Sequence, residues 1–323
     1  MQPNISEGRT TDWAGLMREL GPSLAERSVQ CDASDGFAAE NFAELKARGV
    51  LAAGIPAELG GGGASYPELC EMLRVLSRYC GSTALTLSMH THSLATIVWR
   101  WRRDPGRFEN FLRRVAEQRL QLVTSGASDW LDGSGSAVRT EGGWRVSGRK
   151  IFASGSPSGD LLMTTAVDTS RRDVLHFALP LKAQGVAVID NWRALGMRGT
   201  GSGDVVIDDV FVPDEAISLQ RSTGKWVEPL HLAHTTALPL VFACYLGIAE
   251  ELRGRVVVTL AKRTEDNTVY GLVGDMEVEL ASARMAHRDM VDRRPRWNPG
   301  HRRQTASLLT ALSLAAAFFA WRT

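Results

Sequence analysis

The feature that most constrains the fold is an abrupt change of residue pattern near Leu120. From there to Pro213, short runs rich in β-branched and aromatic residues alternate with Gly, Ser and Asp. These runs predict strands at Leu120–Thr124, Trp144–Phe152, Leu161–Val167, Leu175–Leu179 and Val205–Val212. Because no helical stretch of about 10 to 15 residues separates them, a parallel Rossmann sheet is disfavoured. The pattern favours an antiparallel barrel or sandwich.

Helical spacing dominates on both sides of this region. Before it, the pattern predicts helices that include Leu69–Leu76, Thr83–Trp101 and Asp104–Leu120. After it, His234–Thr264, Leu272–Asp292 and the alanine-rich Thr305–Ala320 are also predicted to be helical. The predicted fold class is therefore α+β. It comprises an N-terminal helical domain over 1–119, a middle β domain over 120–227 and an incomplete C-terminal helical domain over 228–323.

Composition excludes several classes of protein. The formal net charge is +1, with 44% hydrophobic and 23% charged residues, which argues against a nucleic-acid or membrane-surface partner. The four cysteines are scattered without metal-ligand spacing, so we expect no bound metal and no disulfide framework, as suits a cytoplasmic protein. The longest apolar run, Ala311–Trp321, is too short to span a bilayer.

Few standard chemical motifs are present. The sequence contains no GxGxxG after a strand, no GxxxxGK[ST] and no HExxH. The glycine run Gly60–Gly63 is more readily a plain loop than a phosphate-binding loop, because no strand precedes it. His90 and His92 lie two positions apart, which on a helix directs them to different faces and argues against a shared metal. We weigh two interpretations of this pair: one exposed and one partly buried histidine, or a catalytic or substrate-lining role for His92.

Two polar loops follow predicted strands. Val123, Thr124, Ser125 and Gly126 end the first strand, and Phe152–Gly155 ends another. Each offers a hydroxyl, backbone amides and a glycine, so a planar ring with N and O acceptors would be satisfied between them. Ordinary strand-end turns have the same composition, and the pattern does not decide between these interpretations.

Several segments, taken in order, resemble the acyl-CoA dehydrogenase family. They lie between Phe37 and Asp292, and their sequences are LAAGIPAELGG (51–61), STALTLSMHTHSL (82–94), GWRVSGRKIFASG (143–155), ALGMRGTGS (194–202) and VFVP (210–213). Each motif alone is weak, but their shared order on a helix–sheet–helix plan is specific. The resemblance implies a flavin, FAD in most members, held between the β domain and the C-terminal helices. It also implies α,β-desaturation of an acyl-CoA in fatty acid metabolism, with hydride transfer to flavin N5.

The resemblance assigns residues to the flavin site. Val123, Thr124 and Ser125 stand in the loop that bonds the pyrimidine edge, Phe152 corresponds to the ring-flanking tryptophan, and Ser154 to the hydroxyl near N5. Ser128 matches a serine near flavin and acyl-CoA, so Ser128 and His92 are the predicted substrate-binding residues. The family also implies a homo-oligomer, either a dimer or a tetramer. Neither the electron acceptor nor the substrate beyond an acyl-CoA or other small molecule is identified.

The resemblance fails where the catalytic glutamate is expected. One family position falls near Ala237, which cannot act as a base, and Glu250 and Glu251 are interpreted as a solvated helix face. The chain after Asp292 also departs from the family pattern, as a truncated, frame-shifted or divergent C-terminus would. Two alternatives to the dehydrogenase therefore stay open. One is a monooxygenase of the same fold that uses reduced flavin, for which FMN is an alternative to FAD, with His92 and either Ser154 or Ser128 near the ring. The other is a degenerate subunit without turnover.

Overall fold

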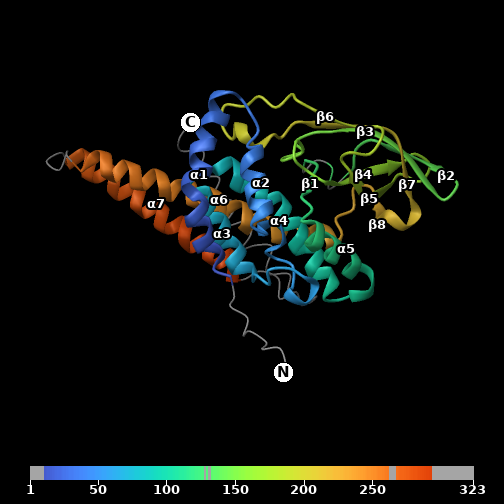
Figure 1. Cartoon of the computed structure of the whole chain (residues 1–323), viewed down its shortest axis with the longest axis horizontal. Coiled ribbons are helices and arrows are strands. Elements are labelled where there is room, and N and C mark those ends of the chain that lie inside the picture. The colour runs from blue at the N-terminus through green and yellow to red at the C-terminus, as the bar shows by residue number, and fades with distance from the viewer. Residues whose placement is uncertain (1–10, 127–128, 130–131, 262–266, 293–323) are drawn as a thin grey trace, which may run out of the picture.

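A helical body and a β-sheet lie side by side in the computed structural model, which describes residues 11–126, 129, 132–261 and 267–292 (Figure 1). The helices are α1 (Trp13–Ala33), α2 (Ala39–Ala47), α3 (Tyr66–Ser77), α4 (Gly81–Trp101), α5 (Pro105–Gln118), α6 (Glu228–Leu260) and α7 (Asn267–Asp292). The order of helices, sheet and helices is the predicted one. The predicted helix over Thr305–Ala320 lies outside the described residues.

Local signals in the sequence set two of the helix starts. Ser65 and Glu68 form a reciprocal capping box at the start of α3, so two backbone N–H groups of the first turn are satisfied by side chains. Pro105 occupies the first turn of α5 as predicted, because a proline there loses no helical hydrogen bond. The Asp104 side chain makes no capping bond, so proline alone marks that start.

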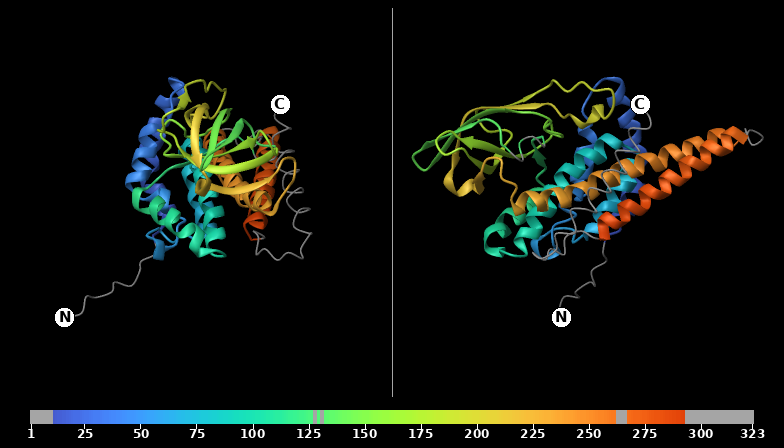
Figure 2. Two further views of the ribbon diagram at one scale, coloured as in Figure 1. Left: turned by 90° about the vertical axis from the view of Figure 1, so that its right-hand side faces the viewer. Right: turned by 180° about the vertical axis from the view of Figure 1, so that it is seen from behind.

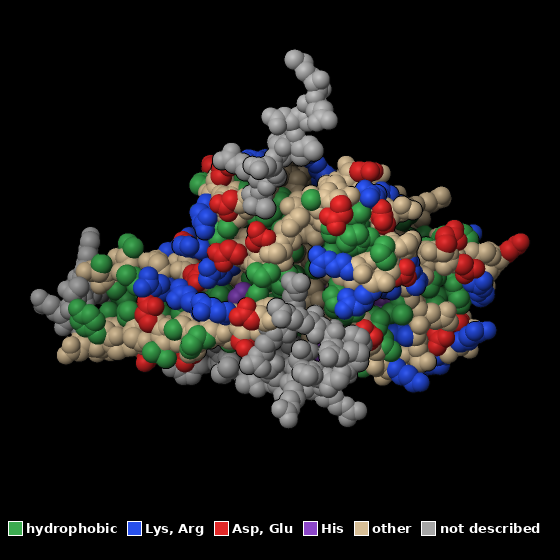
Figure 3. Space-filling view, turned by 90° about the horizontal axis from the view of Figure 1, so that it is seen from below, with side chains coloured by type: hydrophobic (Ala, Val, Ile, Leu, Met, Phe, Trp, Pro, Cys, Tyr) green, Lys and Arg blue, Asp and Glu red, His purple; other side chains and the backbone are tan. Residues whose placement is uncertain are grey.

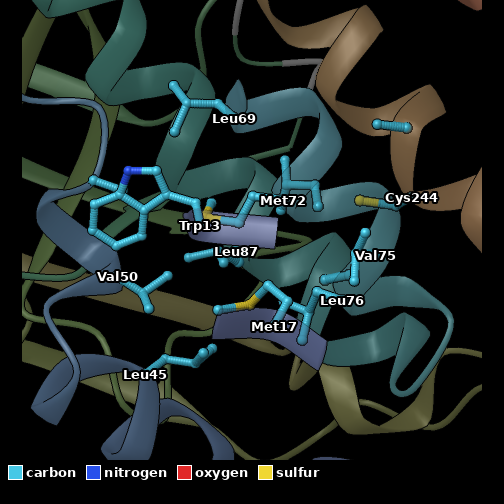
Figure 4. Packing of buried hydrophobic residues seen from close by; sticks show 14 of the residues in the cluster. Trp13, Met17, Leu45, Val50, Leu69, Met72, Val75, Leu76, Leu87 and Cys244 are labelled. Atoms are coloured by element: carbon cyan, nitrogen blue, oxygen red, sulfur yellow. The ribbon is translucent and has the colours of Figure 1, made fainter. Parts of the chain in front are cut away.

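The helices from the two ends of the chain share one hydrophobic core. Trp13 and Met17 of α1 pack with Met72 and Leu76 of α3, and Cys244 of α6 joins the same cluster (Figure 4). The α6 helix contacts both α3 and α4, so the C-terminal helices complete a core that the N-terminal helices begin. The domain limits at 119 and 227 stay predictions, but the described helices on either side of the sheet pack as one body.

The sheet has eight strands, and it is mixed rather than wholly antiparallel. The strands are β1 (Leu122–Thr124), β2 (Ser136–Thr140), β3 (Gly143–Lys150), β4 (Leu161–Asp168), β5 (Asp173–Pro180), β6 (Val186–Ile189), β7 (Asp204–Pro213) and β8 (Ile217–Ser222). Their order is β6-β7-β3-β2-β4-β5-β8, with β1 beside β4.

Both parallel pairs of this sheet involve β4, which pairs with β1 and with β2. The other pairs are antiparallel, so the prediction of an antiparallel sheet is right for most of the sheet and wrong at these two contacts. The physical reason is that neither pair is joined by a hairpin, which would make the strands antiparallel: β2 and β3 lie between β1 and β4 along the chain, and β3 lies between β2 and β4. The strands β2, β6 and β8 were not predicted. They are exposed or half-buried along much of their length; β2 and β8 mix polar with apolar residues, and the apolar run of β6 is only four residues long.

The helices α6 and α7 extend beyond the body as an arm (Figure 2). By length and composition alone α6 is apolar enough to cross a membrane, but its N-terminal half is buried against α3 and α4. Along the arm, Leu252, Val258, Leu272, Val278 and Met285 are exposed. Figure 3 shows such hydrophobic side chains among basic and acidic ones.

Candidate functional site

The two polar strand ends lie next to each other. The Gly126 amide donates a hydrogen bond to the Ile151 carbonyl oxygen at 2.9 Å, which ties the loop after β1 to the loop after β3. A Cβ at Gly126 would lie 3.0 Å from that oxygen, so glycine permits the close approach. The structure therefore brings together the two loops that the sequence proposed as edges for a planar ring.

The residues of the first loop differ in what they can offer a ligand. Val123 is fully buried in the core of the sheet, so only its backbone is available to a ligand. Thr124 is also buried, yet its hydroxyl has no hydrogen-bond partner among the described residues. The Ser125 hydroxyl lies 3.0 Å from the Thr164 hydroxyl of β4. Ser128 lies outside the described residues.

The second loop presents an exposed aromatic ring on a strained backbone. Phe152 has a φ of 55°, in the left-handed region, which costs a residue with a Cβ on the order of 1 kcal/mol. Its ring is 57% exposed and meets the Trp192 ring edge-on, with 6.1 Å between centroids. Strain at an exposed aromatic residue fits a position that packs against a bound planar ring.

Ser154 belongs to a different hydrogen-bond network. Its hydroxyl lies 2.8 Å from that of Ser202, which in turn lies 2.7 Å from that of Thr200. Thr200 accepts, through its carbonyl oxygen, a hydrogen bond from Thr86 of α4. The motif over 194–202 is thereby joined to the loop after β3 and to the first half of α4.

A pocket opens where α4, the sheet and the start of α6 meet. Its polar lining includes His92, Thr96 and Arg100 from α4, Ser125, Asp129, Thr164 and His176 from the β region, and Ser218 from β8. Its apolar lining includes Ile97, Met163, Phe177, Leu219, Leu230 and Ala233. Ser154 and Phe152 do not line it, so the structure places His92 with Ser125 rather than with Ser154.

Both histidines of α4 are buried, at 1% exposure for His90 and 6% for His92, so the expectation of one exposed histidine is wrong. His90 has partners on both ring nitrogens. Nε2 lies 2.7 Å from the Leu51 carbonyl oxygen, and Nδ1 accepts from the Leu122 amide at 2.9 Å. This ring therefore links α4 to β1 as a structural group.

His92 has one nitrogen available. Its Nδ1 lies 3.2 Å from the Ser88 carbonyl oxygen, which only accepts, so Nδ1 carries the proton. Burial lowers the pKa of His92 to about 4, so the ring is neutral at pH 7. Nε2 then presents a lone pair, and no described residue bonds to it. Such a nitrogen can hold or accept a proton from a bound molecule.

One lining residue, Asp129, belongs to a buried ion pair that the sequence did not predict, although its partner Lys150 lies in the motif over 143–155. Lys150 Nζ lies 3.1 Å from Asp129 Oδ2, and it donates to the carbonyl and hydroxyl oxygens of Ser134 at 2.7 and 2.8 Å. Both side chains are almost wholly buried, at 1% and 6% exposure. The carboxylate that lines the pocket is thus held by a cation and is not a free base.

His176 and Arg100 also line the pocket without having been predicted. Arg221 Nε donates to His176 Nε2 at 3.0 Å, and burial with the nearby arginines lowers the pKa of His176 to about 4. A sequence signal for Arg100 did exist. His92, Thr96 and Arg100 recur at intervals of four on a predicted helix, which places them along one face.

The glutamates of α6 are not a solvated face. Glu250 is 11% exposed and accepts from Arg74 at 3.1 Å and from Arg284 at 2.8 Å, which fastens α3, α6 and α7 together. Glu251 is partly exposed and bonds to Arg255. Neither lines the pocket, so no described glutamate takes the place of the missing base.

The glycine run over 60–63 is a plain loop, as the sequence favoured. The amides of Gly60, Gly61, Gly62 and Gly63 all donate to backbone carbonyl oxygens of residues 52–57. None of these four amides is left to bind a phosphate.

Comparison with known families matches two models to this chain. The model described as acyl-CoA dehydrogenase, N-terminal domain, matches residues 17–107, and the model of the middle domain matches residues 124–210. Together they cover more than half of the chain. Both lie within or close to the segment over which the sequence motifs resembled that family.

The similar curated proteins include enzymes with different names. A dibenzothiophene monooxygenase of Mycolicibacterium goodii is 28% identical over 85% of this chain and 71% of its own length. An amino sugar nitrososynthase of Streptomyces rubradiris is 28% identical over 75% of this chain and 59% of its own length. A putative acyl-CoA dehydrogenase of Bacillus subtilis is 24% identical over 87% of this chain and 76% of its own length.

Solved structures share the fold. A nitrososynthase from Micromonospora carbonacea var. africana has a TM-score of 0.82 at 23% identity, over 94% of this chain and 83% of that one. The dibenzothiophene monooxygenase of Paenibacillus sp. A11-2, in a complex with FMN and indole, has a TM-score of 0.80 at 21% identity, over 95% of this chain and 82% of that one.

Proposed function

We propose that this chain, which belongs to the acyl-CoA dehydrogenase family, is a monooxygenase that uses reduced FMN and molecular oxygen. Family membership makes it a flavin oxidoreductase of that fold, as the motifs indicated. The family resemblance first implied desaturation of an acyl-CoA. We propose instead the alternative that the sequence left open, a monooxygenase of the same fold.

The chemistry of the pocket is the observation that carries this proposal. Desaturation needs a carboxylate base within reach of the α-proton of the substrate. Asp129, the carboxylate among the lining residues, is bound to Lys150, and Glu250 is bound to two arginines away from the pocket. Oxygen insertion needs no such base. It is served by a neutral histidine such as His92, whose Nε2 can accept a proton from, or a hydrogen bond of, a group beside the reacting atoms.

The residues around the strand ends fit a flavin ring. The open hydroxyl of Thr124 and the backbone of the loop after β1 would bond its polar edge, and the exposed Phe152 ring would cover one face. When bound, reduced flavin supplies two electrons, so that one oxygen atom enters the substrate and the other leaves as water. The named monooxygenases among the relatives, and the FMN bound by the Paenibacillus enzyme of the same fold, support FMN over the FAD first expected.

Two parallel assays test the proposal. In the first, NADH and a separate flavin reductase supply reduced FMN to the protein in ¹⁸O₂, with indole or dibenzothiophene as substrate. Mass spectrometry should find one labelled oxygen atom in the product. In the second, the flavin-loaded protein is titrated anaerobically with butyryl-CoA and octanoyl-CoA, and the flavin absorbance should stay unchanged.

Two results would contradict the proposal. Bleaching of the flavin by an acyl-CoA, without oxygen incorporation, would establish the dehydrogenase. A purified protein that retains neither oxidised nor reduced flavin would establish the degenerate subunit. The cytoplasmic location and the dimer or tetramer stay predictions that these assays do not address.

A further inference from the structure

The pocket has a cationic end. Arg100 follows His92 by eight positions on α4, which separates their Cα atoms by about 12 Å along the helix axis. Both residues line the pocket, and Arg100 bonds to Ser218, which lines it as well. Much of the remaining lining is apolar and includes Ile97, Phe177, Leu219 and Leu230. The pocket therefore suits a molecule with an apolar body and an anionic group at one end.

Arg100 has few partners for a half-buried guanidinium. One of its terminal nitrogens donates to the Ser218 carbonyl oxygen at 3.3 Å, and its guanidinium carbon lies 4.5 Å from the centre of the Phe108 ring. Within the described part of the chain, no carboxylate lies within ion-pair distance of it. A guanidinium carries five N–H donors, so several remain for a ligand.

In the described part of the chain, no ion pair offsets the charge of Arg100. Arg107 donates to the same Ser218 carbonyl oxygen at 2.9 Å, so a second cation shares this acceptor with Arg100. Arg221 bonds to His176, and the pocket carboxylate Asp129 is already paired with Lys150. Burial, with a smaller contribution from Arg107, lowers the pKa of Arg100, although Asp104 acts against this. A partly desolvated cation of this kind gains most from an anionic ligand.

The position of Arg100 favours the substrate over the flavin phosphate as the source of that anion. The loop after β3 lies near Thr86, because Thr86 bonds to Thr200, whose hydroxyl is linked through Ser202 to Ser154. Thr86 precedes Arg100 by 14 positions on α4, or about 21 Å along the helix. Phe152 and Ser154 also do not line the pocket that contains Arg100.

We propose that Arg100 binds an anionic group of the substrate and so selects apolar or aromatic acids, whose reacting end then lies toward His92. This inference rests on the proposed function, because the substrate meant here is the molecule that receives the oxygen atom. The carboxylate would receive two parallel hydrogen bonds from the guanidinium, which is the geometry that arginine offers and lysine does not.

A matched pair of ligands tests the proposal by binding alone. Indole-3-acetate and its neutral amide, indole-3-acetamide, share their size and ring and differ in charge. Calorimetric titration of the wild-type protein should give at least about tenfold tighter binding of the acid, weakening with added salt, while the amide is unaffected by salt. In Arg100→Gln the two affinities should become equal, and Arg100→Lys should retain part of the preference. Arg103→Gln is the control, because Arg103 lies over the Trp99 ring and does not line the pocket.

Several outcomes would overturn this assignment. A wild-type protein that binds neither ligand, or binds the amide as tightly as the acid, would do so. Arg100→Gln that keeps the preference for the acid would do so as well. If Arg100→Gln instead weakens FMN but not riboflavin, with an unchanged acid preference, Arg100 holds the flavin phosphate.

Two measurements keep these outcomes interpretable. The salt dependence in the wild type remains decisive if Arg100→Gln fails to fold. Because binding is measured without turnover, a protein that prefers the acid but inserts no oxygen would refute the proposed function and leave the anion subsite standing.

Discussion

His90 and His92 lie two positions apart on one helix and have different hydrogen-bond partners in the structure. Both are buried, and burial lowers the pKa of each to about 4. His90 is bonded through both ring nitrogens to the backbone of Leu51 and Leu122. His92 is bonded through Nδ1 alone and lines the pocket with Nε2 open. Burial and pKa therefore do not distinguish the two histidines, whereas the partners of each ring nitrogen leave only His92 with a nitrogen open to a ligand.

The largest expected difference between the two residues is in turnover. His92→Ala should lower the rate of oxygen incorporation by about 10² to 10⁴, which is the usual contribution of a proton-transfer group. Its free energy of unfolding should change by no more than about 1 kcal/mol, because the lost bond is one contact to a helix carbonyl that keeps its own helical partner. Steady-state product formation and urea denaturation measure the two effects. Wild-type turnover in His92→Ala would contradict the proton-transfer role proposed for His92.

The reverse pattern is expected at His90. His90→Ala leaves the Leu122 amide and the Leu51 carbonyl without the ring, and we expect a loss of about 2 to 5 kcal/mol of folding free energy. Urea denaturation at pH 7 measures it, with His92→Ala as the matched control on the same helix. A His90→Ala variant that is no less stable than His92→Ala would contradict the structural role of His90.

Acid should destabilise the protein through both rings. The folded-state pKa of each is about 4, below the value near 6.5 of the unfolded chain, so the unfolded state binds protons first. Stability is therefore full above about pH 6.5 and is lost as the pH falls toward 4, at about 2 kcal/mol per histidine by pH 5. Unfolding curves at pH 7 and pH 5 measure this loss. In His92→Ala the difference between the two curves should shrink by about that amount, and an unchanged difference would exclude a neutral, buried His92.

The smallest expected effect is at a second open polar group. The Thr124 hydroxyl, like His92 Nε2, has no partner among the described residues, and the flavin assignment gives it one. Thr124→Val should weaken flavin binding by about tenfold, which is one hydrogen bond, and should leave the unfolding free energy nearly unchanged. Fluorescence titration of FMN measures the affinity, and Thr124→Ser, which keeps the hydroxyl, is the control. Unchanged affinity would remove Thr124 from the flavin site.

Much of the fold was predictable because it depends on local pattern. The helices over 83–101 and 105–118 and the five predicted strands agree with the structure to within a few residues, since periodic apolar residues and proline act within one element. The strands β2 and β8 were missed because polar residues interrupt their apolar pattern, and β6 because its apolar run is only four residues long. The parallel pairing at β4 was missed because strand direction depends on where a chain enters a sheet.

The candidate site was predictable in part. The loops after β1 and β3 were identified from hydroxyls and glycines, and the tie between Gly126 and Ile151 brings them together. Asp129, Lys150, His176 and Arg100 were not identified, although all four bear on the pocket. Their importance lies in contacts between residues that are distant in sequence.

The order of helices, sheet and helices and the resemblance to the acyl-CoA dehydrogenase family could be established without a structure, since both depend on residues that are neighbours along the chain. Only the tertiary structure shows which buried groups are open to a ligand. A histidine or carboxylate is functional or structural according to what lies opposite its polar atoms. His92 lines the pocket with Nε2 open, whereas His90 bonds to the backbone of Leu51 and Leu122. Asp129 is paired with Lys150.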